Sequence, residues 1–145
     1  MNFPEPREGL VVRYSYLWHR EYKAGLEEGT KDRPCAVVLS ATDIHSRRRV
    51  MVLPITHSPP GNSGDAIEIP AATKARLGLD SEQSWIVISE INRFTWPGPD
   101  VRPIPGRDVS TIAYGMLPPS FFARVRDAFL ARCTGNRVWI VRRSE

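Results

Sequence analysis

Polar residues stand at the ends of two apolar, strand-length segments of the sequence. Arg33, followed by a proline, opens the segment "PCAVVLS", and Thr56 with His57 closes the segment "RVMVLPIT". If the two segments pair as antiparallel strands across the intervening "ATDIHSRR" turn, the start of one lies beside the end of the other. Arg33 and Thr56 then become spatial neighbours.

This pairing would assemble groups suited to chemistry on a phosphodiester. An arginine offers a fixed fork of donors to a phosphate, and a hydroxyl adds a further donor. A carboxylate from the preceding loop, Glu27 or Glu28, can act as general base. In RNA the 2′-hydroxyl supplies the nucleophile, so no metal is needed. A structural alternative remains open, in which Arg33 extends to solvent and the Thr-His pair forms a turn.

Other kinds of catalytic or metal site have little support in the sequence. His19, His45 and His57 are isolated from one another, so we predict no metal site and no cofactor. No serine lies in a "GxSxG" turn, and "GLEEG" lacks the lysine and spacing of a nucleotide-binding loop. Cys35 and Cys133 form neither a disulfide framework nor a ligand pair, and we expect both to be buried, reduced thiols.

The composition is that of an ordinary globular domain. The chain has 145 residues, about one domain in length, and 13 prolines argue against long helices, so the fold should be mostly strand and turn. The net charge of +4 permits an anionic partner without requiring one. No apolar segment approaches the roughly 20 residues of a membrane helix, and the N-terminus does not resemble a signal peptide. We therefore expect a cytoplasmic protein without a membrane partner.

Turn residues and periodicity place the elements that would position these groups. Strands are expected at 9–18, 34–40, 49–56, 66–70, 84–94 and 136–145. Residues 19–32 are predicted to form a long exposed loop, and 70–79 one or two helical turns ending at Gly78. A longer helix is expected at 118–133, with Phe122, Val125 and Phe129 on its buried face. Five or six strands around this helix suggest a small, strongly curved barrel or sheet.

Two features of these elements bear on partners and on the end of the chain. The arginines near the C-terminus, Arg142 and Arg143, are expected to be solvated. Apolar residues to spare on "VMVLPI" and on the terminal helix favour a two-fold homodimer, because self-complementary patches commonly cover such surface.

The same segments resemble a known family. In order and type, "GLVVRYSYLW", "EEGTKDRPCAVVLS", "VLPIT", "AIEIP", "WIVISEINRF" and "GMLPPSFFARVRDAFL" are similar to the PemK/MazF toxins of bacterial toxin-antitoxin systems. The resemblance covers about residues 9–130 of a single 1–145 domain and leaves 131–145 as a C-terminal extension. It implies a small SH3-like β-barrel of the PemK/MazF/CcdB type with a C-terminal helix, forming a homodimer. It also implies a sequence-selective, metal-independent endoribonuclease that cleaves single-stranded RNA and is blocked by a cognate antitoxin.

The resemblance assigns roles to individual residues by position. Arg33 of "DRP" resembles the family's catalytic arginine, and Thr56 of "PIT" its catalytic threonine. Glu28 stands where many members place a loop carboxylate, although this loop is longer and Glu27 could serve instead. Glu90 falls where some members carry an aspartate thought to act as base.

The expected substrate-binding residues are His57, His19 and Lys31. His57 departs from the Ser or Thr that usually follows the threonine, and could add a titratable acid or cap the turn. Ile88 replaces a basic residue that some members have two positions before the acid.

Two alternatives from other functional classes accompany the ribonuclease hypothesis. One is a protein-binding barrel resembling the gyrase poison CcdB, which acts by docking to a partner without chemistry of its own. The other is a domain that binds RNA without cleaving it.

Overall fold

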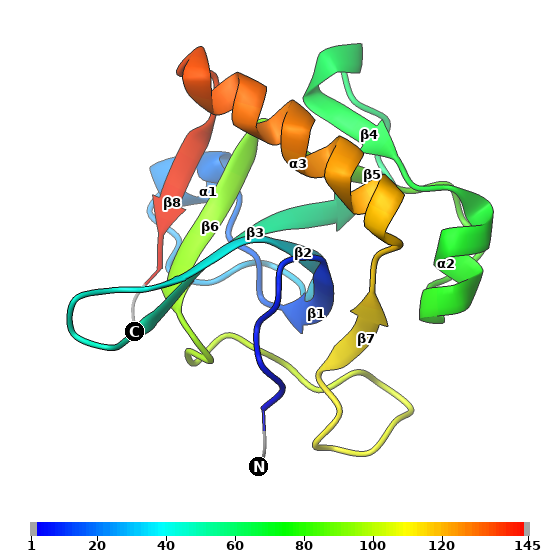
Figure 1. Cartoon of the computed structure of the whole chain (residues 1–145), viewed down its shortest axis with the longest axis horizontal. Helices are drawn as coiled ribbons and strands as arrows, with labels where there is room; N and C mark the ends of the chain where they lie inside the picture. Colours follow the sequence, from blue (N-terminus) through cyan, green and yellow to red (C-terminus); the bar gives the residue numbers. More distant parts are fainter. Residues whose placement is uncertain (1–2, 144–145) are drawn as a thin grey trace.

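Eight strands and three α-helices make up the fold, which a computed structural model describes for residues 3–143 (Figure 1). The strands are β1 (Leu10–Tyr14), β2 (Arg33–Thr42), β3 (Arg48–Thr56), β4 (Ala66–Glu68), β5 (Trp85–Val87), β6 (Glu90–Thr95), β7 (Ala113–Met116) and β8 (Trp139–Arg142). The helices are α1 (His19–Lys23), α2 (Ala71–Leu77) and α3 (Pro119–Thr134), with a short 3-10 turn, η1, at Ser63–Asp65. A mainly-β fold with a C-terminal helix, as predicted, is confirmed.

The strands form one open sheet. Its hydrogen-bonded order is β4-β5-β3-β2-β1-β7, with β6 joined to β3 and β8 joined to β6. Neighbouring strands are antiparallel except β6 and β8, which run parallel. Within residues 3–143, β4 and β7 end this path without pairing to each other, so the closed barrel expected from the sequence is not formed. The physical reason is that β3 branches: Arg49–Val52 pair with β6, whereas Ile55 and Thr56 pair with β5.

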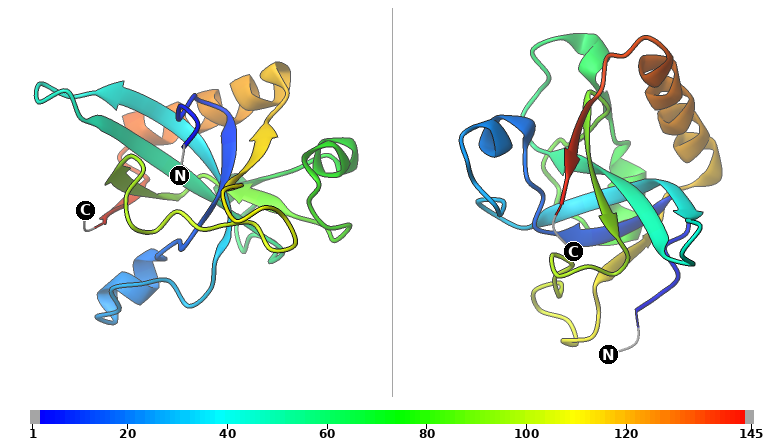
Figure 2. Two further views of the ribbon diagram at one scale, coloured as in Figure 1. Left: turned by 90° about the horizontal axis from the view of Figure 1, so that it is seen from below. Right: turned by 90° about the vertical axis from the view of Figure 1, so that its left-hand side faces the viewer.

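The two faces of the sheet carry two apolar clusters. Side chains alternate along a strand, so Val11 belongs to the cluster under α3 and Val12 to the cluster on the opposite face. Helices α3 and α1 lie on opposite sides of the sheet (Figure 2). On α3 the predicted stripe of Phe122, Val125 and Phe129 is buried, as expected from its helical spacing.

The apolar residues on which the dimer prediction rested are largely used inside the subunit. In "VMVLPI", Val50, Val52 and Leu53 are fully buried and Ile55 nearly so. The aromatic residues of α3 likewise pack on the sheet rather than facing outward. These segments therefore leave little apolar surface for a second copy.

Three elements differ from the sequence prediction. The first five residues of the expected loop 19–32 form α1, because the Glu21 carboxylate accepts a hydrogen bond from Trp18 N at 3.0 Å and stabilises the first turn. The expected strand 84–94 is two strands, β5 and β6, which pair with different parts of β3. Strand β7 was not predicted. By contrast α2 ends as expected, at Gly78 with φ of 71°, a left-handed conformation that glycine adopts readily.

The C-terminal strand forms as predicted, but one of its arginines does not lie where expected. Arg142 is exposed, whereas Arg143 is buried. Arg143 Nη1 donates to Ser15 O at 2.6 Å and to Asn92 Oδ1 at 3.0 Å, and Nη2 lies 3.1 Å from Asp100 Oδ2. The prediction of a solvated Arg143 is therefore wrong, since these partners, distant in sequence, compensate its burial. Residues 144–145 of the predicted strand lie outside the described residues.

Two further expectations concern the cysteines and the membrane. Cys35 is buried as predicted, but Cys133 is exposed because it lies on the outer side of the last turn of α3. Within residues 3–143, no helix is both long and apolar enough to cross a bilayer.

Candidate functional site

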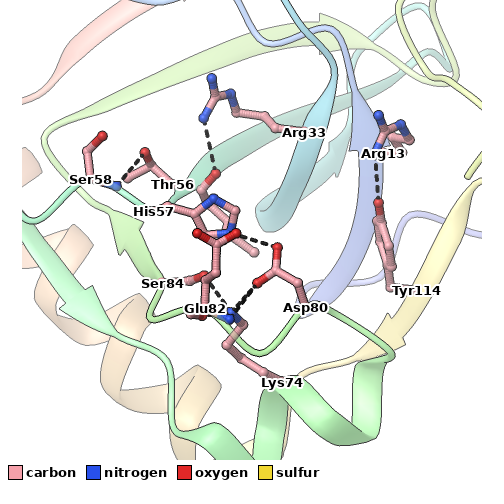
Figure 3. Close-up of polar contacts among 11 residues, drawn as sticks. Arg13, Arg33, Thr56, His57, Ser58, Lys74, Asp80, Glu82, Ser84 and Tyr114 are labelled. Carbon is pink, nitrogen blue, oxygen red and sulfur yellow. Dashed lines mark hydrogen bonds and ion pairs between the residues drawn. The ribbon is translucent and has the colours of Figure 1, made fainter. Parts of the chain in front are cut away.

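Arg33 and Thr56 lie side by side, as the predicted pairing of their strands requires. Strands β2 and β3 are antiparallel, with Cys35 opposite Pro54, and this register continues to Arg33 opposite Thr56. Arg33 Nη1 donates a hydrogen bond to Ile55 O at 3.3 Å, which joins the two strand ends (Figure 3). The short β2–β3 connection sets this register, so the neighbourhood follows from local sequence.

The Arg33 side chain is a buried cation that lacks a direct anionic partner. Arg33 is only 9% exposed, its guanidinium lies 5.0 Å from the centre of the Trp18 ring, and its Nε has no hydrogen-bond partner within residues 3–143. Desolvation by burial lowers the pKa of Arg33, although the Glu21 carboxylate opposes this through its charge. A buried charge without a partner is costly. An anion that reached this guanidinium would therefore be bound favourably.

Arg33 lies in the wall of an open cleft of about 560 Å³. The cleft is bordered by β1, the segment before β2, the end of β3, α2 with the loop that follows it, and β7. Its charged lining residues are the basic Arg13, Arg20, Lys31, Arg33 and Lys74 and the acidic Asp32 and Asp80. The excess of basic groups makes the cleft attractive to an anionic ligand.

Thr56 offers a hydroxyl donor to the same cleft. Its Oγ1 accepts a hydrogen bond from Ser58 N at 3.2 Å, which closes a short turn after β3. Because the oxygen is the acceptor in this contact, its hydrogen remains available for a ligand. Thr56 can therefore donate to a phosphate oxygen beside Arg33.

The next residue, His57, belongs to a charged network with α2 and the loop after it. His57 Nε2 lies 2.7 Å from Asp80 Oδ2, and the ammonium of Lys74 lies 2.8 Å from Asp80 Oδ1 (Figure 3). Lys74 is itself buried, and it also donates to Ser84 Oγ at 2.7 Å and to Glu82 O. Partial burial would raise the pKa of Asp80, but the hydrogen bonds from Lys74 and His57 outweigh it and lower that pKa.

The same region contains the side chains that come closest to a metal-ligating group. The ligand atoms of His57, Asp80 and Glu82 lie within 4.8 Å of one another, and all three residues are exposed. The ammonium of Lys74 already contacts Asp80 and the backbone of Glu82, which opposes a second cation there. We assign no metal to this group.

Not all sequence-predicted site residues reach the cleft. Lys31 and His57 line it together with Arg33 and Thr56, whereas Glu28, Glu90 and His19 are not among its lining residues. Glu28 is exposed in the segment between α1 and β2.

Glu90 and His19 instead stabilise the other side of α1. Glu90 Oε1 accepts hydrogen bonds from Tyr16 Oη at 3.1 Å and from His19 N at 2.9 Å, and burial raises the pKa of Glu90. The His19 ring stacks on Trp139 with ring centres 4.2 Å apart. Both side chains thus have structural partners.

Sequence reasoning missed the groups that α1, α2 and β7 bring to the cleft. Trp18 and Arg20 enter it from α1, and Lys74 and Asp80 from α2 and its following loop. On β1, Arg13 lies with its Nη1 3.2 Å from Tyr114 Oη of the unpredicted β7. The only sequence signal for Lys74 was its place on a short helix, and nothing near Asp80 indicated that it would meet His57.

Comparison of the sequence with models of known protein families and with curated proteins finds no match.

Proposed function

We propose that this chain is a metal-independent endoribonuclease that cleaves single-stranded RNA in the cleft around Arg33, and that it is related to the PemK/MazF toxins. The observation that carries the proposal is the buried Arg33 guanidinium, which opens onto a basic cleft and has no ion-pair partner among residues 3–143. A phosphodiester supplies the negative charge that this guanidinium lacks.

The proposed reaction uses the substrate's own nucleophile. The 2′-oxygen attacks the adjacent phosphorus and forms a new P–O bond, the bond from phosphorus to the 5′-oxygen breaks, and the products carry a 2′,3′-cyclic phosphate and a 5′-hydroxyl. Arg33 stabilises the negative charge that develops on the phosphorane, and Thr56 donates to one of its oxygens. Donors fixed before the reaction are effective because they need no rearrangement as charge develops.

The relation to PemK/MazF toxins rests on the sequence segments and on the order of elements. In this proposal the open, branched sheet corresponds to the SH3-like barrel of that family, and the protein acts as a homodimer restrained by a cognate antitoxin. Sedimentation at micromolar concentration tests the dimer, and a species with the mass of the monomer alone would contradict that part of the proposal. The alternative of a CcdB-like docking protein is disfavoured, because docking gives no reason for an unpaired cation at the wall of a recessed cleft.

The test is cleavage of a mixed-sequence, single-stranded RNA pool in EDTA. We expect fragments with 2′,3′-cyclic phosphate ends, and no cutting at a site whose 5′ ribose is replaced by deoxyribose. Arg33→Ala should reduce the rate on the order of 100-fold or more. Arg124→Ala, which removes the same charge from an exposed position on α3, is the matched control and should cleave like the unmodified protein. A pool left intact by the unmodified protein would overturn the proposal.

A further inference from the structure

Cleavage through the 2′-hydroxyl needs a group that accepts its proton, and the predicted carboxylates are badly placed for this. Neither Glu28 nor Glu90 lines the cleft. His57 does, and it directly follows Thr56, whose strand position is opposite Arg33. An imidazole is the side chain most often used to move protons near neutral pH.

The hydrogen bond to Asp80 prepares His57 to accept a proton. An ionised carboxylate only accepts hydrogen bonds, so the 2.7 Å contact assigns the ring proton to Nε2. The lone pair is then on Nδ1, the ring nitrogen that Asp80 does not engage. The carboxylate also stabilises the imidazolium that forms when Nδ1 takes up a proton.

Lys74 holds Asp80 in this orientation. Its side chain is 6% exposed, and its ammonium bonds Asp80 Oδ1 while His57 meets Oδ2 of the same carboxylate. Each carboxylate oxygen thus has its own partner, and the loop that carries Asp80 is further tied through Glu82 O. Lys74 and Asp80 are positioning residues in this arrangement, since they act through His57.

The charges around His57 come from several elements. Asp80 and Glu82 of the loop after α2 lie 2.7 Å and 3.8 Å from Nε2. Lys74 of α2, Arg33 of β2 and, in the segment before β2, Lys31 and Asp32 share the cleft with it. The carboxylates favour the protonated ring and the cations oppose it, so the ring is placed between opposing influences.

We propose that His57, oriented by Asp80 and Lys74, is the catalytic base of the RNA cleavage; this inference rests on the function proposed above. Nδ1 accepts the proton of the 2′-hydroxyl as its oxygen bonds to phosphorus, and the 5′-oxygen leaves and takes a proton from solvent. The imidazolium returns its proton to solvent after the cyclic phosphate departs, so the enzyme is regenerated without a metal or another reactant.

The experiment compares His57→Gln, Asp80→Asn and the unmodified protein in EDTA, with rate constants measured across pH. Gln keeps a donor for Asp80 but cannot accept and release a proton in this range. We expect His57→Gln to lower kcat about 100- to 10,000-fold and to lose the rise of rate with pH, as expected for removal of a general base. Affinity for a strand with deoxyribose at the cutting site should change by less than about threefold. Asp80→Asn should lower kcat while KM changes little.

The outcomes separate the two proposals. A His57→Gln protein with the rate and pH profile of the unmodified protein would overturn the role of His57 and leave the ribonuclease function standing. Loss of the deoxyribose strand's binding together with cleavage would assign His57 to substrate binding, and thereby also overturn it as base. Activity that disappears in EDTA and returns with zinc would replace the proton-transfer role by a metal site at His57, Asp80 and Glu82. An unmodified protein that cleaves no RNA would overturn both proposals.

Discussion

The guanidinium of Arg143 lies 3.1 Å from the carboxylate of Asp100 and joins the end of the described chain to the loop before β7. Both side chains are largely shielded from solvent, at 2% and 11% exposure. The ion pair therefore belongs to the interior of the fold, although Arg143 lies in the segment expected to be an extension of the domain.

Removal of Arg143 should destabilise the fold severely. Arg143→Ala leaves Asp100 buried without its cation and deprives Ser15 O and Asn92 of a donor. Breaking one side of a buried pair costs about 3 kcal/mol or more. The free energy of unfolding in urea should fall by this amount, whereas Arg142→Ala, at the exposed neighbouring position, should change it by less than about 0.5 kcal/mol. Equal losses in the two variants would contradict the burial of Arg143.

Arg33 should behave in the opposite way, since its charge serves the ligand rather than the fold. Arg33→Met replaces an uncompensated buried cation by an apolar chain of similar length, and such replacements are often neutral or stabilising. We expect urea unfolding to show an unchanged or higher stability, together with loss of cleavage and of RNA binding. An Arg33→Met protein whose free energy of unfolding falls by about 2 kcal/mol would show that Arg33 is a packing residue.

Glu90 should make stability depend on pH in a defined direction. Burial raises the pKa of Glu90 above its ordinary 4.5, so its contribution to stability is fully present below pH 4.5 and is lost as pH rises through the folded-state pKa. Glu90→Gln imitates the protonated form. This variant should match the unmodified protein near pH 4 and be more stable than it at pH 7, as measured by urea unfolding. A variant that is less stable only at pH 7 would reverse the sign and refute the argument.

The two acids assigned as bases from the resemblance should be dispensable for cleavage. Glu28→Gln and Glu90→Gln change residues that do not line the cleft, so kcat should stay within about threefold of the unmodified value, against the large loss expected for a general base. Single-turnover cleavage of the RNA pool measures this. A loss of 100-fold or more in either variant would return the base to that carboxylate.

Gly29 should tolerate no side chain. A Cβ at this position would lie 2.1 Å from the backbone oxygen of Tyr16, so the segment leading to Thr30 and Lys31 in the cleft would have to move. Gly29→Ala should lower the melting temperature and weaken RNA binding. Gly61→Ala is the matched control, because its Cβ would meet no atom within 4 Å. A Gly29→Ala protein as stable as the control would show that this segment is not held against Tyr16.

Local sequence was enough for several parts of the fold and site. The apolar spacing of Phe122, Val125 and Phe129 predicted the buried face of α3, because helical periodicity repeats over a single segment. The neighbourhood of Arg33 and Thr56 was predictable for a similar reason. Two apolar strands joined by a short turn can pair in few registers, and a shift by one residue would turn their apolar side chains outward.

Contacts between distant segments decided the rest. The branching of β3 between β5 and β6, which keeps the sheet open, depends on how separate strands share one partner and leaves no trace in the alternation of any single strand. His57 meets Asp80, 23 residues away, only because α2 and its following loop pack beside the end of β3. Arg143 is buried because Ser15, Asn92 and Asp100, brought together by β1, β6 and the loop before β7, satisfy its donors. A charged side chain is ordinarily solvated, and only partners assembled by the tertiary structure can make its burial favourable.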